Sequence, residues 1–73
     1  MFSAFMFYFS QKTHPQLVDV TDTWRNAVVL RREVIDWLNA NVPNRYSYTP
    51  GELQAAVLLK NKEDAALFKM MWL

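Results

Sequence analysis

Residues that could do chemistry are few in this chain and are not grouped. His14 is the single histidine, there is no cysteine, and Gly51 is the single glycine. Nucleophilic catalysis needs a nucleophile beside a base, but His14 stands before Pro15 and has no neighbouring spacing that indicates a triad. A glycine-rich phosphate loop needs more glycine than the chain contains. The sequence therefore predicts a protein that is not an enzyme.

The acidic residues nearest to His14 do not form a metal-binding pattern. Asp19 and Asp22 could approach the histidine, but their spacing matches neither a zinc motif nor a calcium loop. Most other carboxylates lie on the polar sides of the helices predicted below. We therefore expect neither a metal nor another cofactor.

The overall composition favours binding to a macromolecule. Eight Lys and Arg against seven Asp and Glu give a net charge of +1, which produces no strong field for nucleic acid or an anionic membrane. Hydrophobic residues make up 52% of the 73 residues, whereas a domain of this size hides only about 60% of its unfolded surface. The apolar surplus indicates contact with a partner, which could be a second copy of the chain.

The first candidate for binding is the aromatic run at residues 2–9, which reads as a strand that is apolar on both faces. Such a strand is either central in a sheet or covered by helix on one side and by a partner on the other. We expect the face with Phe5, Phe7 and Phe9 to be left uncovered, where these rings could pack against protein or stack on bases. In the alternative, they line the core while Met6 and Tyr8 face outward.

Two further candidates combine arginine with apolar or aromatic neighbours. Arg31 falls within the apolar side of a predicted helix, where a guanidinium must pair with a carboxylate of the fold, extend to the sheet edge or reach a partner. Arg45, Tyr46 and Tyr48 form a short run of residue types that are favoured at interfaces. The alternative for this run is an ordinary edge strand.

The clearest predicted element is a long helix from about Asp22 to Asn41. Asp19, Thr21 or Asp22 could cap its start, and Asn41 followed by Pro43 marks its end. Apolar residues recur at helical spacing and form one broad side of this segment. They are Trp24, Ala27, Val28, Leu30, Val34, Ile35, Trp37 and Leu38.

The second half of the chain leaves one choice open. Residues 49–52, Thr-Pro-Gly-Glu, fit a type II turn between two strands, but they also fit a capping box that opens a helix over residues 53–59. The continuous apolar run at residues 56–59 favours the turn. Asn61 with Asp64 predicts a short helix at residues 62–67. Residues 68–73 either extend that helix or form a strand.

These elements predict one α+β domain that spans residues 1–73. A β-α-β-β order with a short C-terminal helix or strand would form a two-layer sandwich, with one long helix on a small, mainly antiparallel sheet. One helix leaves a sheet face uncovered.

No stretch approaches the about 18 apolar residues of a membrane helix, and the lack of cysteine suits a reducing compartment, so we expect a cytoplasmic protein that does not cross a membrane.

The C-terminal residues 60–72 resemble the ending of small uncharacterised phage proteins, in which an apolar strand leads to Asp-Ala, Leu-Phe-Lys and a closing Trp. Here these are Asp64-Ala65, residues 67–69 and Trp72. The resemblance covers about the last fifth of the chain and transfers no functional residue. It implies a viral origin and a role as a modulator of a host enzyme or defence complex, such as an anti-CRISPR or similar inhibitor.

Together, these observations predict a non-enzymatic protein-binding module, a phage-encoded modulator or inhibitor of a host protein in the host cytoplasm. Two alternatives stay open. One is single-stranded nucleic-acid binding through Phe5, Phe7 or Phe9 with Tyr46 and Tyr48. The other is a structural homodimer or small homo-oligomer, in which the exposed strand face pairs with its copy.

Overall fold

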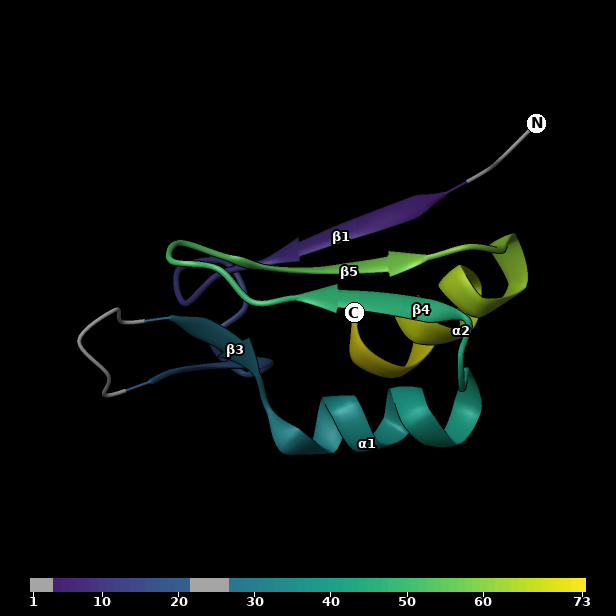
Figure 1. The fold of residues 1–73 in the computed structure, drawn as a ribbon, viewed down its shortest axis with the longest axis horizontal. Coiled ribbons are helices and arrows are strands. Elements are labelled where there is room, and N and C mark those ends of the chain that lie inside the picture. The colour runs from purple at the N-terminus through teal and green to yellow at the C-terminus, as the bar shows by residue number, and fades with distance from the viewer. Residues whose placement is uncertain (1–3, 22–26) are drawn as a thin grey trace.

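The computed structural model describes residues 4–21 and 27–73 as an α+β domain, which confirms the predicted fold class (Figure 1). Its elements in chain order are β1 (Phe5–Phe9), β2 (Val18–Val20), β3 (Val28–Leu30), α1 (Arg32–Asn41), β4 (Tyr46–Thr49), β5 (Ala55–Leu59) and α2 (Lys62–Trp72).

The main sheet has three antiparallel strands in the order β1-β5-β4. Phe7 and Tyr48 both lie opposite Val57 of the central strand. β1 is therefore an edge strand, and the interpretation of this aromatic segment as a central strand is wrong. Phe2 and Ser3, which we also expected in this strand, lie outside the described residues. The buried centre falls instead to β5, whose run of alanine, valine and leucine suits a strand with neighbours on both sides.

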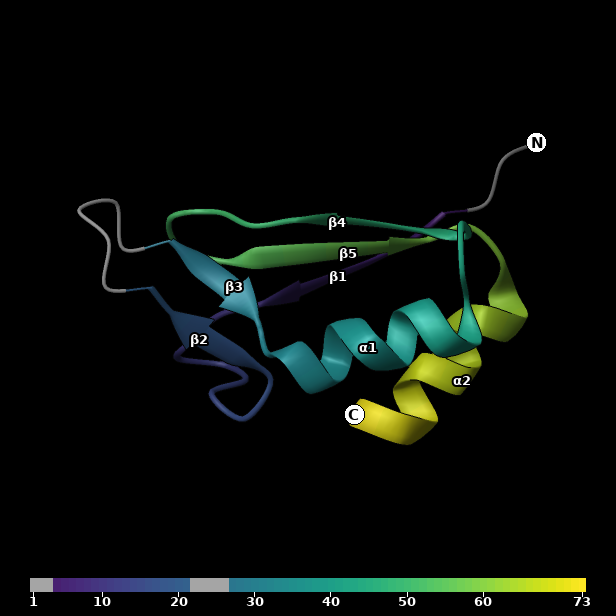
Figure 2. The same cartoon turned by 60° about the horizontal axis from the view of Figure 1, so that its bottom comes forward.

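Both helices lie on the same face of this sheet, as Figures 1 and 2 show. Leu38 of α1 and Phe68 of α2 are fully buried together with Val57 and Leu59 of the central strand. The ring of Phe68 packs against those of Phe9 and Trp37, each with centroids 5.9 Å apart. The core therefore fills the space between one sheet face and the helix layer.

The second helix begins as the sequence predicts. The backbone N–H of Asp64 donates to Oδ1 of Asn61 at 2.8 Å, which makes Asn61 the N-cap. The helix then continues to Trp72. The prediction that residues 68–73 extend the helix is therefore correct, and the alternative prediction of a strand is wrong.

The predicted long helix is wrong at residues 27–31. Val28–Leu30 forms β3, which pairs antiparallel with β2, and α1 begins only at Arg32. The expected start at Asp22 and residues 23–26 lie outside the described residues, whereas the predicted end at Asn41 is confirmed. Two consecutive valines and a leucine suit a strand as well as a helix face, and pairing with β2, 8 to 12 residues earlier in the chain, decides between them.

The connection between β4 and β5 joins two strands, so the capping-box reading of residues 49–52 is wrong. The turn is not of type II, because Gly51 lacks the positive φ that this turn requires. Position 51 requires glycine for a different reason, which is that there is no room for a Cβ atom. A Cβ on Gly51 would overlap the carbonyl oxygen of Gln54, and the N–H of Val28 donates to the carbonyl of Gly51 at 2.6 Å. This bridge links the β2-β3 hairpin to the main sheet.

Candidate protein-binding surface

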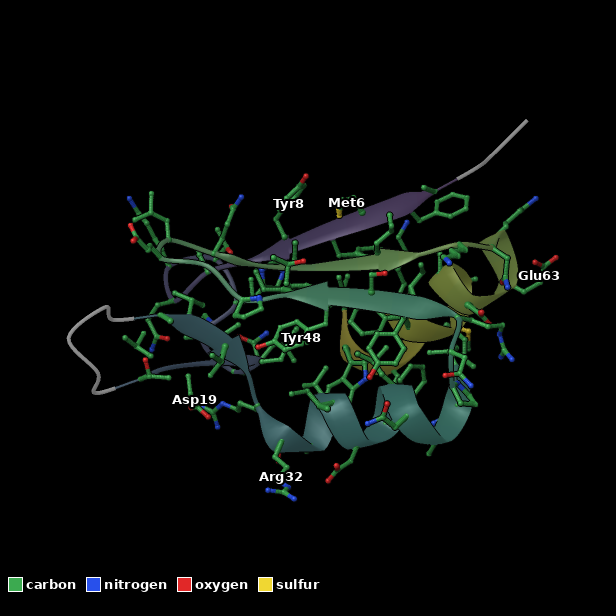
Figure 3. All side chains as sticks on the ribbon, in the orientation of Figure 1. Met6, Tyr8, Asp19, Arg32, Tyr48 and Glu63 are labelled. Atoms are coloured by element: carbon green, nitrogen blue, oxygen red, sulfur yellow. The ribbon has the colours of Figure 1, made fainter. Side chains whose placement is uncertain are left out.

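The three-stranded sheet has one covered face and one uncovered face. Residues that lie opposite each other on paired strands point to the same side, so the register assigns each side chain to a face. Met6 and Tyr8 point away from the helices in Figure 3, whereas Tyr48 points toward them. We call the uncovered side the open face. It consists of Met6, Tyr8, Ser47, Thr49, Ala56 and Leu58.

The open face is apolar at its centre and uncharged throughout. Met6 is 48% exposed and Tyr8 52% exposed. Leu58 and Ala56 lie beside them, half-buried between their strand neighbours, and Ser47 and Thr49 add hydroxyl groups. No described segment covers this side of the sheet in Figures 1 and 2. Such a surface can bind a flat apolar partner, but it brings together no groups that could do acid-base chemistry.

The expectation that Phe5, Phe7 and Phe9 form the uncovered face is wrong. Phe9 is only 1% exposed, Phe5 and Phe7 are half-buried against the core, and the ring of Phe7 lies 5.3 Å from that of Phe68. The alternative with Met6 and Tyr8 outward is the correct one. The large rings fill the space under the helices, and base stacking by these three residues would need them exposed.

Arg31 pairs within the fold. Its Nε lies 3.5 Å from Oδ1 of Asp19, and its Nη2 donates to the carbonyl of Pro15 at 3.2 Å. Since α1 begins only after Arg31, the guanidinium does not lie on an apolar helix side at all. Of the three roles that the sequence left open, pairing with a carboxylate of the fold is the one observed.

Arg45 connects the end of α1 with the start of α2. Its Nε donates to Oδ2 of Asp64 at 2.9 Å, and its Nη2 donates to the carbonyl of Asn41 at 3.1 Å. The hydrogen bond and the charge of Asp64 raise the pKa of Arg45. The charged guanidinium is therefore favoured in the folded state, and this contribution, present at neutral pH, is lost as the pH rises through that pKa.

Tyr46 and Tyr48 are half-buried on the covered face. The hydroxyl of Tyr46 donates to Oδ1 of Asn39 on α1. The backbone N–H of Leu30 on β3 donates to the hydroxyl of Tyr48 at 3.0 Å. The two tyrosines therefore fasten α1 and the hairpin to the sheet.

The seven residues predicted from the sequence are thus not gathered in one exposed site. Each of them makes contacts inside the fold, as described above. The open face was not predicted as the binding surface. It consists of the alternate residues of the same strands, above all Met6, Tyr8 and Leu58. The available signal was the apolar character of both faces of the first strand, which does not say which face the helices cover.

A second exposed apolar surface lies on the helix layer. Leu67, Met70 and Met71 of α2 line a shallow groove of about 230 Å³ together with Trp37 and Asn41 of α1. We call it the helix groove. Met70 is 85% exposed, and methionine side chains adapt readily to different neighbours.

Within residues 4–21 and 27–73, no group of three His, Cys, Asp or Glu could hold a metal ion. The ring of His14 lies edge-on to Phe9, with centroids 5.0 Å apart, and its Nδ1 is 2.9 Å from Oγ1 of Thr13. Among the described helices, none has the length and apolar character to cross a membrane.

Comparison with known proteins finds no similarity on which a function could be based. No protein-family model matches the chain, and no curated protein or solved structure matches it either. Apart from the resemblance of residues 60–72, any proposal about function therefore depends on the surfaces described above.

Proposed function

We propose that the protein is a non-enzymatic protein-binding module that contacts its partner through the open face. The observation that carries the proposal is the one-sided sheet: both helices cover the face with Phe9 and Val57, while Met6, Tyr8 and Leu58 stay uncovered on the other. Tyrosine and methionine are enriched at protein interfaces, and charged residues are depleted at their centres.

The open face is a better candidate than the helix groove because less side-chain freedom is lost when it binds. Met6 is its one long, flexible side chain, whereas the groove has two. The groove is lined in part by the long side chains of Met70 and Met71, which must become ordered first.

The partner that fits this surface is a protein with its own flat apolar patch. Its rim would offer hydrogen-bonding groups to the hydroxyls of Tyr8, Ser47 and Thr49. The resemblance of residues 60–72 to small phage proteins supports a bacterial host protein in this role. Binding would then act by covering a functional surface of that protein in the host cytoplasm.

The test is affinity capture from nuclease-treated bacterial lysates with the wild-type chain and two variants. The first variant, Ser47→Glu with Leu58→Ser, removes the apolar side chain at the centre of the open face, adds a charge beside it on β4 and leaves β1 unchanged. The control, Leu53→Ser, removes an apolar side chain that is 85% exposed and lies outside the open face. We expect the first variant to bind a captured partner at least about tenfold more weakly and the control to bind like the wild type.

Two results would contradict the proposal. Equal capture by the wild type and the open-face variant would show that the partner binds elsewhere. Loss of capture on Met70→Ser with retention by the open-face variant would assign the function to the helix groove. Thermal unfolding of each variant checks that lost capture does not reflect lost folding.

A further inference from the structure

β1 has one side that is not paired with any described strand. Its register partners all lie on β5, and Figure 1 shows no described element along its other side. The strand has five residues, all apolar or aromatic, with no charge, proline or glycine. Natural edge strands are normally protected by charged residues or proline, or by a covering element. An unprotected edge of this kind is a template for another strand.

The opposite edge of the same sheet differs in its flanking residues and in what lies next to it. β4 is flanked by Arg45 and Pro50, and it contains Ser47 and Thr49. Next to its end, Gly51 forms a bridge with Val28 of β3. At this end the chain itself extends the sheet by one bridge, whereas no described strand or bridge lies beside β1 on the side away from β5.

The aromatic rings on β1 are less covered than their neighbours on the central strand. Phe5 and Phe7 lie on the covered face, yet both are only half-buried. Their register partners on β5, Leu59 and Val57, are fully buried. A further strand beside β1 would bring side chains against the exposed sides of these two rings.

We propose that two copies of the chain pair antiparallel through β1, around a twofold axis at Phe7. The strand Phe-Met-Phe-Tyr-Phe is nearly the same in both directions, which suits the self-complementary contact of a twofold dimer. Phe5 then lies opposite Phe9 of the second copy, and Met6 lies opposite its Tyr8. Each pair joins apolar or aromatic side chains.

This register also keeps both copies in the same orientation relative to the sheet. Odd-numbered residues meet odd-numbered ones, so the helices of both copies cover the same side of a six-stranded sheet. The two open faces become continuous across the seam. The dimer requires only the β1 edge and therefore does not depend on the proposed binding function.

Light scattering coupled to size exclusion, over a range of protein concentrations, tests the proposal. We expect the wild type to have twice the mass of the chain at high concentration. The double variant Met6→Lys with Tyr8→Lys places like charges opposite each other twice at the seam. It should dimerise at least about tenfold more weakly.

The matched control is Met6→Glu with Tyr8→Lys, which alters the same two exposed positions. In the proposed register each new carboxylate faces a new ammonium group, so this variant should dimerise more strongly than the double lysine variant. Circular dichroism checks that both variants fold. Variant Ser47→Glu with Leu58→Ser should remain dimeric, which separates this test from the capture test.

Three results would overturn the proposal. One is a wild type that has the mass of a single chain at every concentration. Another is a double lysine variant that dimerises as strongly as the wild type. The third is equal dimerisation of the double lysine and the glutamate-lysine variants, which would exclude the register in which Met6 lies opposite Tyr8.

Discussion

The two faces of the three-stranded sheet are built from alternate residues of the same strands, yet they have different roles. On one face, Phe9, Val57 and Leu59 are buried beneath the helices. On the other, Met6 and Tyr8 remain about half exposed. Both sets of residues on β1 are apolar, so hydrophobicity alone does not distinguish core from surface. The difference is that aromatic rings on one face interlock with Phe68 of α2.

The largest difference between the faces should appear on truncation of β1 side chains. Phe9→Ala removes a fully buried ring that contacts Phe68, and we expect it to lower the free energy of unfolding by about 3–5 kcal/mol. Tyr8→Ala, one position away on the open face, should lower it by no more than about 1 kcal/mol, because about half of that ring is already exposed. Urea denaturation of a dilute sample measures both values. Similar losses for the two variants would contradict the assignment of the faces.

A smaller effect is expected from the polar contact that fastens the hairpin to the covered face. Tyr48→Phe leaves the buried N–H of Leu30 without its acceptor, which should cost about 1–3 kcal/mol of unfolding free energy. Tyr46→Phe removes a hydroxyl whose contact with Asn39 is exposed to solvent, and its cost should be below that of Tyr48→Phe. Thermal unfolding compares the two. The reverse order would show that the hairpin is not held through Tyr48.

The smallest of these effects concerns the cap of the helix that supplies Phe68. Asn61→Ala removes the acceptor for the N–H of Asp64 and should cost about 1 kcal/mol. Asn61→Ser keeps a side-chain oxygen at the N-cap and should restore most of that stability. Chemical denaturation of the two variants provides the measurement. No difference between them would mean that the helix layer does not depend on this cap.

Local signals predicted a large part of the fold. Asn61 with Asp64 located the start of α2, Asn41 and Pro43 located the end of α1, and the apolar run before Lys60 indicated β5. Each of these signals lies within a few residues of the feature that it marks. They act through the backbone nearby, which makes them readable from the sequence.

The features that were missed depend on contacts between residues eight or more positions apart in the chain. Val28–Leu30 becomes a strand because it pairs with β2 across the chain segment between them. Arg45 pairs with Asp64, which is 19 residues away. The choice between the two faces of β1 depends on where the helices pack. Such contacts form only in the folded chain, so the exposed side of β1 was assigned to the wrong residues.

The contacts of Asp64 link three segments, and this affects how the domain unfolds locally. Its carboxylate accepts hydrogen bonds from the side chains of Asn61 and Arg45, and Arg45 also donates to the carbonyl of Asn41. The end of α1, the start of β4 and the first turn of α2 therefore share one set of contacts. We expect amide hydrogens in these three segments to exchange with solvent at matching rates, as a single cooperative unit within the domain.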